Sequence, residues 1–205
     1  MKKYILTTLS LFFLIGSVSA QQIEKRLLAL NERNETLVAP FTEVKVMPKL
    51  KKEIRKEGNL YFQYPNALSM RYTNPEGDYS VIKDGGKFYT KRGQKKMKLN
   101  LKDPDSQFSH LRNTLIFSLS GEVEAVAKEN DAKIKAQESA TRFLFTIEKK
   151  HTPKVGVCRL QLVYDKVTGA LLLLKMEEVN GNYTSYETID PVTKKLIPQE
   201  VWEVE

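Results

Sequence analysis

The chain has 205 residues, of which 41% are hydrophobic and 28% charged, and its formal net charge is +8. This length predicts one domain with a sizeable core. The single cysteine, Cys158, excludes an intramolecular disulfide, so the hydrophobic core must supply the stability.

Residues 1–20 have the pattern of a cleaved signal peptide. Lys2 and Lys3 precede an apolar run from Ile5 to Ile15, and Val18-Ser19-Ala20 offers the small residues that signal peptidase requires. The alternative is a membrane anchor, but a bilayer core of roughly 30 Å needs about 20 apolar residues. We therefore expect a single exported domain, residues 21–205, in the periplasm or outside the cell.

Removal of Lys2 and Lys3 lowers the formal net charge from +8 to +6. The remaining excess lies mostly in Lys49–Arg55 and Lys91–Lys98. Solvated strand faces account for such charge, and a weak attraction to acidic lipid headgroups or acidic proteins is the functional alternative. No nucleic-acid motif is present, and an exported chain is not expected to meet nucleic acid.

Two helices are predicted. Residues 21–35 place Ile23, Leu27 and Leu30 on one stripe. A second helix is predicted over residues 104–120, with Asp103 as N-cap, Pro104 at its first position and Gly121 as its stop. Its apolar stripe consists of Phe108, Leu111, Leu115 and Leu119. Residues 122–129 could add one or two helical turns, with Glu122, Glu124 and Glu129 on a solvated face.

Most other segments alternate apolar and polar residues, as half-buried strands do. Examples are residues 97–101, 143–147, 158–164 and 183–189, and Gly85-Gly86 marks a hairpin turn. Short strands joined by Asn-Gly and Asp-Gly turns indicate a meandering antiparallel sheet. The predicted class is α+β: an incomplete antiparallel barrel, or large curved sheet, with helices on its concave side. The run from Ala170 to Leu174 is apolar at every position, so both faces should be covered there.

Catalysis has little support in the sequence. His110 and His151 are the two histidines, and no cluster of His, Cys or carboxylate residues has the spacing of a zinc site. No nucleophile elbow, phosphate-binding loop or dinucleotide fingerprint is present. Cys158 alternates with Leu160 and Leu162, which indicates a buried small side chain rather than a catalytic thiol. We therefore expect neither an enzyme nor a cofactor. The apolar concave face is either a filled core or a pocket for an apolar ligand.

Residues 58–90, GNLYFQYPNALSMRYTNPEGDYSVIKDGGKFYT, resemble the LolA-like periplasmic carriers of outer-membrane lipoproteins. The family's order of features is met by Gly58, Pro65-Asn66, Thr73-Asn-Pro75 and Asp84-Gly-Gly-Lys87, and upstream by Phe41-Thr42-Glu43. The signal peptide and the leading helix also fit. The resemblance covers about a fifth of the chain, and the rest agrees in its order of elements.

The resemblance implies a monomeric carrier that binds the acyl chains of lipoproteins in an apolar cavity. Its partners would be an inner-membrane release transporter and an outer-membrane receptor. The family pattern gives a cavity lining through Leu68 and Met70, and strand parity adds Tyr72. Helical periodicity, not the motif, adds Leu111, Leu115 and Leu119 as lid residues. Each of these six could equally be ordinary core.

Two positions depart from the family pattern. The family's Arg before the first Pro, thought to keep the lid closed through hydrogen bonds, is Tyr64 here, and the common Trp is Met70. Tyr64 offers one O–H but no charged fork. Two alternatives to a carrier remain open: a module on the same scaffold that senses lipids or lipoproteins without shuttling them, and an exported enzyme or adhesive domain without a lipid cavity.

Overall fold

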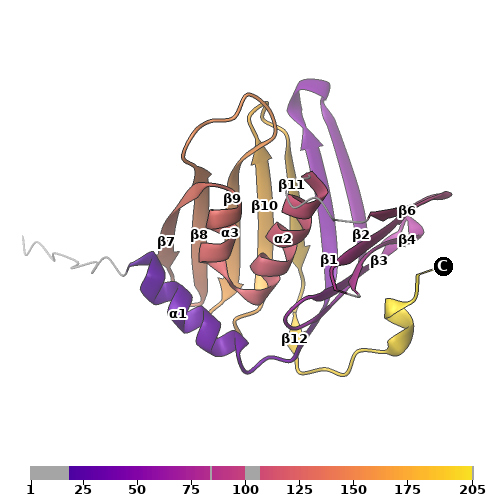
Figure 1. The fold of residues 1–205 in the computed structure, drawn as a ribbon, viewed down its shortest axis with the longest axis horizontal. Coiled ribbons are helices and arrows are strands. Elements are labelled where there is room, and N and C mark those ends of the chain that lie inside the picture. Colours follow the sequence, from indigo (N-terminus) through magenta and orange to yellow (C-terminus); the bar gives the residue numbers. More distant parts are fainter. Residues whose placement is uncertain (1–18, 84, 100–106, 205) are drawn as a thin grey trace, which may run out of the picture.

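The computed structural model describes residues 19–83, 85–99 and 107–204. Within these residues, a 12-stranded antiparallel sheet has the order β6-β5-β4-β3-β2-β1-β11-β10-β9-β8-β7, and β12 pairs with the start of β1 (Figure 1). The strands are β1 (Thr36–Met47), β2 (Lys52–Gln63), β3 (Ala67–Asn74), β4 (Glu76–Lys83), β5 (Lys87–Arg92), β6 (Lys95–Leu99), β7 (Ala132–Glu138), β8 (Arg142–Lys149), β9 (Val157–Asp165), β10 (Leu171–Glu178), β11 (Tyr183–Thr188) and β12 (Val192–Thr193).

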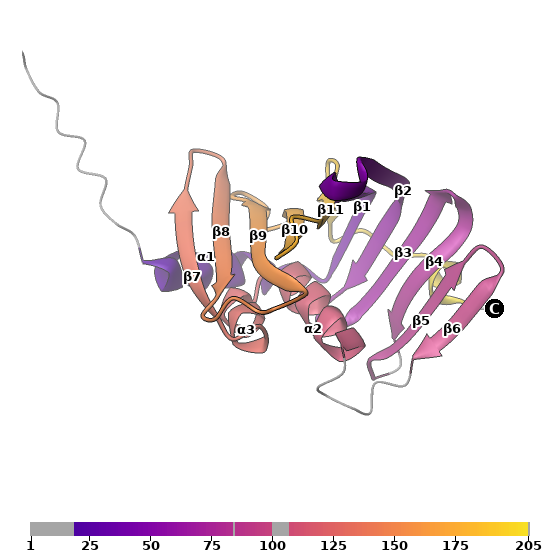
Figure 2. The ribbon, with the colours of Figure 1, turned by 90° about the horizontal axis from the view of Figure 1, so that it is seen from above.

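Three α-helices lie on one side of the sheet in the described part of the chain: α1 (Ala20–Asn31), α2 (Gln107–Ser120) and α3 (Val123–Glu129). Figure 2 shows that the sheet bends around α2. We call the face that packs against the helices the inner face. The predicted α+β class, a large open curved sheet with helices on its concave side, is confirmed.

The core lies between the inner face and the helices, and its members come from every layer. Phe41, Phe62, Phe143 and Phe145 from the sheet and Leu27 from α1 are each at most 2% exposed. The alternation of buried and half-buried side chains along β8 and β9 follows the period of two that the sequence showed. Burial of one face of each strand therefore fixes the register of the sheet.

Helix α1 ends earlier than the sequence predicted. The apolar stripe suggested residues 21–35, whereas the helix ends at Asn31. Beyond it, the side-chain amide of Asn34 donates to the carbonyl of Thr168 at 2.9 Å and to Asn31 Oδ1 at 3.2 Å. Asn34 is thus bonded to the β9–β10 connection and to Asn31 where the predicted helix would have continued.

Helix α2 ends at Ser120, and the predicted stop Gly121 follows it. The φ of Gly121 is +79°, a left-handed conformation that glycine adopts without steric cost and that closes the last turn. The predicted N-cap Asp103 and first position Pro104 lie outside the described residues. The predicted further turns are present as α3.

The hairpin at Gly85-Gly86 joins β4 to β5 as expected, whereas β7 had not been predicted as a separate strand.

The apolar run at the start of β10 is covered on one face only. Leu171 and Leu174 are 4% and 1% exposed on the inner face. Leu172 and Leu173 are only half-buried and line a groove on the outer face together with Val163. Because the register shifts between Leu171 and Leu173, the buried pair Leu171 and Leu174 lies on the inner face, and Leu172 and Leu173 lie on the outer face. The prediction that both faces are covered is therefore wrong for the outer one.

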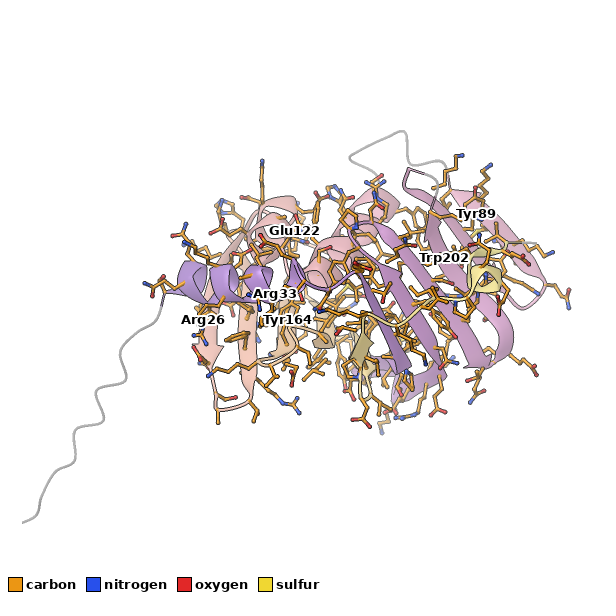
Figure 3. The ribbon with its side chains drawn as sticks, turned by 90° about the horizontal axis from the view of Figure 1, so that it is seen from below. Arg26, Arg33, Tyr89, Glu122, Tyr164 and Trp202 are labelled. Atoms are coloured by element: carbon orange, nitrogen blue, oxygen red, sulfur yellow. The ribbon has the colours of Figure 1, made fainter. Side chains whose placement is uncertain are left out.

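The C-terminal segment crosses to the outer face. It ends in a 3-10 helix, η2 (Gln199–Trp202), which packs on β3. Ser69 Oγ donates to the carbonyl of Val201 at 2.6 Å, and Arg71 donates to the same carbonyl at 2.7 and 3.0 Å. Lys83 Nζ donates to the carbonyl of Trp202 at 2.7 Å, and Figure 3 labels this tryptophan. Strand β3 thus faces the helices on one side and the C-terminal segment on the other.

Among the described residues, no helix combines the length and apolarity needed to cross a membrane.

Candidate functional site

Strand β3 presents its predicted lining residues to the inner face. Leu68, Met70 and Tyr72 are 1%, 3% and 4% exposed and belong to the main core. Ser69 and Arg71, between them, face the C-terminal segment. The predicted alternation along β3 is therefore present. Leu68, Met70 and Tyr72 all point to the inner face, and their side chains are packed within the core.

Burial along α2 increases toward its C-terminal end. Phe108 is 44% exposed and Leu111 is half-buried, whereas Leu115 and Leu119 are 7% and 2% exposed. The C-terminal half of α2 is thus packed against the sheet, and its N-terminal half leaves room beside it.

A groove of about 690 Å³ occupies that room, between α2, the end of α3 and the strands β9 and β10. Its apolar lining consists of Phe108, Leu111, Val155, Val157, Leu160 and Met176. Its polar rim consists of His110, Thr114, Glu129, Asn130 and Lys149. Of the six predicted lining residues, Leu111 lines this groove, and the other five lie in the adjoining core.

Leu160 and Met176 also line the groove, although the sequence did not predict this role for them. They are register partners on β9 and β10, and both point toward α2. The alternation around Leu160 was visible in the sequence. The strand order that places β9 and β10 opposite α2 was not, because it depends on pairings across the whole chain.

One contact at the rim joins α2 to α3. His110 Nδ1 lies 2.5 Å from Glu129 Oε1, and the two side chains are 45% and 17% exposed. The prediction of a solvated face for Glu129 is therefore wrong, because its carboxylate is engaged across the rim. The pair links the first turns of α2 to the last residue of α3 beside the groove.

The C-terminal end of α2 is fastened by side chains from three different segments. The last carbonyls of a helix have no partner within it. Here Tyr164 Oη donates to the carbonyl of Ser118 at 2.8 Å, and Tyr64 Oη donates to that of Leu119 at 3.1 Å. Asn31 Nδ2 donates to the carbonyl of Ser120 at 3.0 Å. Tyr64, at the predicted latch position, thus contacts the helix that the sequence predicted as a lid.

Burial keeps Tyr64 a neutral donor. Desolvation raises the pKa of Tyr64 far above its usual 10, although a hydrogen bond with the side chain of Asn34 lowers it slightly. Ser120 Oγ adds a second contact between α2 and the same turn, since it donates to the carbonyl of Pro65 at 3.2 Å. Two neutral hydrogen bonds therefore stand where the family pattern has a cation.

Asn31 is enclosed by two glycines. A Cβ atom at Gly121 would lie 2.5 Å from Asn31 Nδ2, and one at Gly169 would lie 2.5 Å from Asn31 Oδ1. Both glycines have positive φ, +79° and +76°. The end of α1, the end of α2 and the β9–β10 turn therefore meet at one side chain.

Tyr72 leads from the apolar wall into a polar network. Its ring packs edge-on against Phe41 with centroids 5.2 Å apart, while its hydroxyl donates to Glu43 Oε2 at 2.5 Å. Arg92 Nη2 donates to the same hydroxyl at 3.3 Å. Burial and the neighbouring Glu43 charge both raise the pKa of Tyr72. Tyr72, which was predicted to line the cavity, therefore contributes an apolar ring, while its hydroxyl is already hydrogen-bonded to Glu43 and Arg92.

In the part of the chain that the structure describes, no group of three or more His, Cys, Asp or Glu side chains is placed to bind a metal ion. Cys158 is half-buried, and its Sγ lies 3.5 Å from the carbonyl of Glu177. The site therefore offers apolar surface and a polar rim.

No family model and no curated protein matches the chain. Among solved structures, it is similar to a LolA superfamily protein from Nitrosomonas europaea, with 11% identity and a TM-score of 0.44 over 91% of this chain and 98% of that one. It is also similar to the Pseudomonas aeruginosa MucA/MucB complex structure, with 9% identity and a TM-score of 0.46 over 92% of this chain and 62% of that one.

The lipoprotein LppX from Mycobacterium tuberculosis is a third match, with 9% identity and a TM-score of 0.40 over 88% of this chain and 99% of that one. All three are similarities of fold at identities below 25% and TM-scores below 0.5, and they carry no argument about family, ligands or function.

Proposed function

We propose that the protein is a periplasmic carrier that binds the acyl chains of lipoproteins in the groove beside α2 and transfers them to the outer membrane. The observation that carries this proposal is the apolar groove of about 690 Å³ at the less buried end of a helix whose other end is fastened. The motif at residues 58–90 supports the same function, because its family carries lipoproteins.

The groove has the chemistry that an acyl chain needs. Its volume lies within the range of about 300–1,000 Å³ usual for small-ligand sites, which are mostly apolar with a few polar groups. Each CH₂ group that an acyl chain buries contributes about 0.8 kcal/mol without any directional contact. Lys149 and His110 lie at the polar rim, so a headgroup or peptide attached to the chain would meet cationic or polar side chains there.

The adjoining core gives the groove room to deepen. Leu68, Met70, Leu115 and Leu119 belong to the same core as Leu160 and Leu111. If α2 tilts away from the sheet, these side chains extend the apolar wall of the groove, and that role fits their predicted place in the cavity lining. Tyr64 would hold the C-terminal end of α2 as the pivot of this movement through its bond to Leu119. A ligand that prefers the tilted state would shift the population toward it.

The proposal is tested first by what the protein carries. Native mass spectrometry of the protein isolated from its own periplasm should show an adduct with the mass of an acylated species. The purified protein should also bind a fluorescent fatty acid, and Leu111→Glu should weaken that binding at least about tenfold, because a carboxylate in the groove must stay solvated or be neutralised.

Leu196→Glu is the matched control, because Leu196 is 89% exposed and lies outside the groove. Equal binding by both variants would refute the assignment of the groove. A carrier must also solubilise a lipoprotein from inner-membrane vesicles that contain the release transporter and deliver it to the outer-membrane receptor. A protein that binds acyl chains but releases no lipoprotein would instead be a lipid or lipoprotein sensor.

A further inference from the structure

Val155 and Gly156, which line the groove, belong to a connection at one end of the sheet, and three hairpin connections form that end. These are residues 48–51 between β1 and β2, 150–156 between β8 and β9, and 179–182 between β10 and β11. The register pairs Val46 with Tyr183 and Glu178 with Val157, so the three connections lie along the same end, at the top of Figure 1. We call residues 48–51, 150–156 and 179–182 the open end.

Each connection of the open end exposes one apolar side chain. Leu50 is 71% exposed, Val155 is 82% exposed and Val179 is 40% exposed. Val155 also lines the groove, so the exposed apolar surface continues into the proposed acyl site. Single exposed apolar residues are normal on protein surfaces, so these three indicate a binding surface only together with the residues around them.

The surroundings are cationic. Lys49, Lys51 and Lys52 flank Leu50, and Lys150 and Lys154 precede Val155, all of them exposed. Lys150 pairs with Asp131 at 2.7 Å, whereas the other four make no ion pair within the described residues. The carboxylates nearest in sequence to the tips are Glu53 and Glu178. The open end therefore carries an excess of positive charge.

The opposite end of the sheet shows that apolar exposure alone does not mark this surface. Leu196 is 89% exposed there, beside Lys194 and Lys195. These residues line a pocket together with Glu32, Glu35 and Glu122, so carboxylates offset the lysines. Strand β1, with 12 residues, separates the two ends by roughly 35 Å. The open end combines excess cations with three exposed apolar side chains, whereas the cationic strand β6 exposes one, Met97.

We propose that the open end docks on a bilayer surface that contains anionic lipids. Leu50, Val155 and Val179 would enter the headgroup region, and the surrounding lysines would pair with lipid phosphates. Apolar insertion combined with basic side chains is the usual requirement for stable but reversible attachment of a protein to a bilayer. Long lysine side chains reach the headgroups while their methylene groups follow the apolar surface.

A bilayer fits this surface better than an acidic protein does. The apolar side chains lie on three separate tips among lysines, whereas the centre of a protein interface is contiguous and depleted of charge. The docked orientation also turns the mouth of the groove toward the membrane. The inference goes beyond acyl binding, because it depends on the outer surface of the three tips and not on occupancy of the groove.

The test uses the chain from residue 21 to 205 with vesicles of phosphatidylglycerol and phosphatidylethanolamine, and with neutral phosphatidylcholine vesicles. Co-sedimentation should show binding to the anionic vesicles only, and the binding should fall as salt rises. Neutralising Lys49, Lys51 and Lys52 to glutamine should weaken it by roughly fivefold for each lysine. Leu50→Ser should weaken it further at high salt, where the apolar contribution remains.

The opposite end provides the matched control. Lys194→Gln with Lys195→Gln, and separately Leu196→Ser, should leave vesicle binding unchanged. Equal loss in these variants, equal binding to neutral vesicles, or binding to an acidic protein but to neither vesicle would overturn the proposal.

Docking and acyl binding can fail separately. Leu111→Glu should weaken fatty-acid binding at least about tenfold yet leave the attachment of the protein to anionic vesicles intact, because Leu111 lies inside the groove. Loss of vesicle binding in this variant, with the fold retained by circular dichroism, would show that attachment proceeds through the acyl site and would refute a separate docking surface.

Discussion

The hydroxyl of Tyr64 donates a hydrogen bond to the backbone carbonyl of Leu119 at 3.1 Å, and so joins the turn after β2 to the end of α2. The two residues lie 55 positions apart in the chain. The contact fastens the helix through a neutral group, and burial ensures that this group stays protonated.

Tyr64→Phe should destabilise the protein by about 1–2 kcal/mol, because the Leu119 carbonyl loses a donor in a largely dry site. Urea unfolding measures this change, and hydrogen exchange should be faster in the C-terminal turn of α2 than in the sheet. Tyr61→Phe is the control, since Tyr61 lies on the other face of β2 and pairs with Ser69. Equal effects of the two substitutions would show that the Tyr64 hydroxyl does not fasten α2.

Gly121→Ala should cost more stability than Gly93→Ala. Both glycines have positive φ, so each alanine incurs about 1–2 kcal/mol of backbone strain. A Cβ at Gly121 would also lie 2.5 Å from Asn31 Nδ2, whereas nothing lies within 4 Å of a Cβ at Gly93. Thermal unfolding should show an additional loss of at least about 1 kcal/mol for Gly121→Ala. Similar losses would mean that Asn31 moves aside without cost.

Glu24 should make stability depend on pH. It is 6% exposed, and its Oε1 accepts a hydrogen bond from the backbone N–H of Glu124 at 2.8 Å. Desolvation raises the pKa of Glu24 above its usual 4.5, although the backbone N–H groups at the start of α3 lower it in part. The folded state therefore holds this proton more tightly than the unfolded state, so the resulting stabilisation is present below about pH 4.5 and is lost as the pH rises through the folded pKa.

Glu24→Gln keeps the acceptor but cannot ionise. The variant should gain stability relative to the natural protein as the pH rises from 4 to 7, which urea unfolding at a series of pH values would measure. A stability difference that is constant over this range would contradict the assignment of the titration to Glu24.

Arg71→Ala should release the C-terminal segment. Arg71 donates twice to the carbonyl of Val201 and once to that of Glu203. Hydrogen bonds from a charged group contribute about 1.5–3 kcal/mol, so digestion by a carboxypeptidase should accelerate about tenfold or more. Arg159→Ala is the control, because Arg159 makes ion pairs with Glu148 and Glu177 at the surface of the sheet. If both variants resist digestion equally, Arg71 does not hold this segment.

Local patterns predicted much of the fold. Alternation along residues 143–147 and 158–164 identified β8 and β9, and the stripe of leucines identified α2, because both periodicities are properties of neighbouring residues. The orientation of Leu68, Met70 and Tyr72 toward the inner face followed from the same parity.

Features that depend on distant partners escaped prediction. Helix α1 ends at Asn31 where that residue contacts Ser120, 89 positions away. Leu160 and Met176 face the groove because β9 and β10 lie opposite α2, and no local pattern encodes that strand order. The contact of His110 with Glu129 likewise requires the relative placement of two helices.

The fastening of α2 at one end makes the helix a lever. Its 14 residues span about 21 Å, so a rotation of about 10° around the fastened end would carry Phe108, in the first turn, by about 3 Å. The Tyr64 hydrogen bond, next to the pivot, would barely lengthen. If the contact of His110 with Glu129 at the rim opens, the groove would widen at its mouth without unfastening the C-terminal end of α2. The proposed acyl site could then accept chains of different thickness and number.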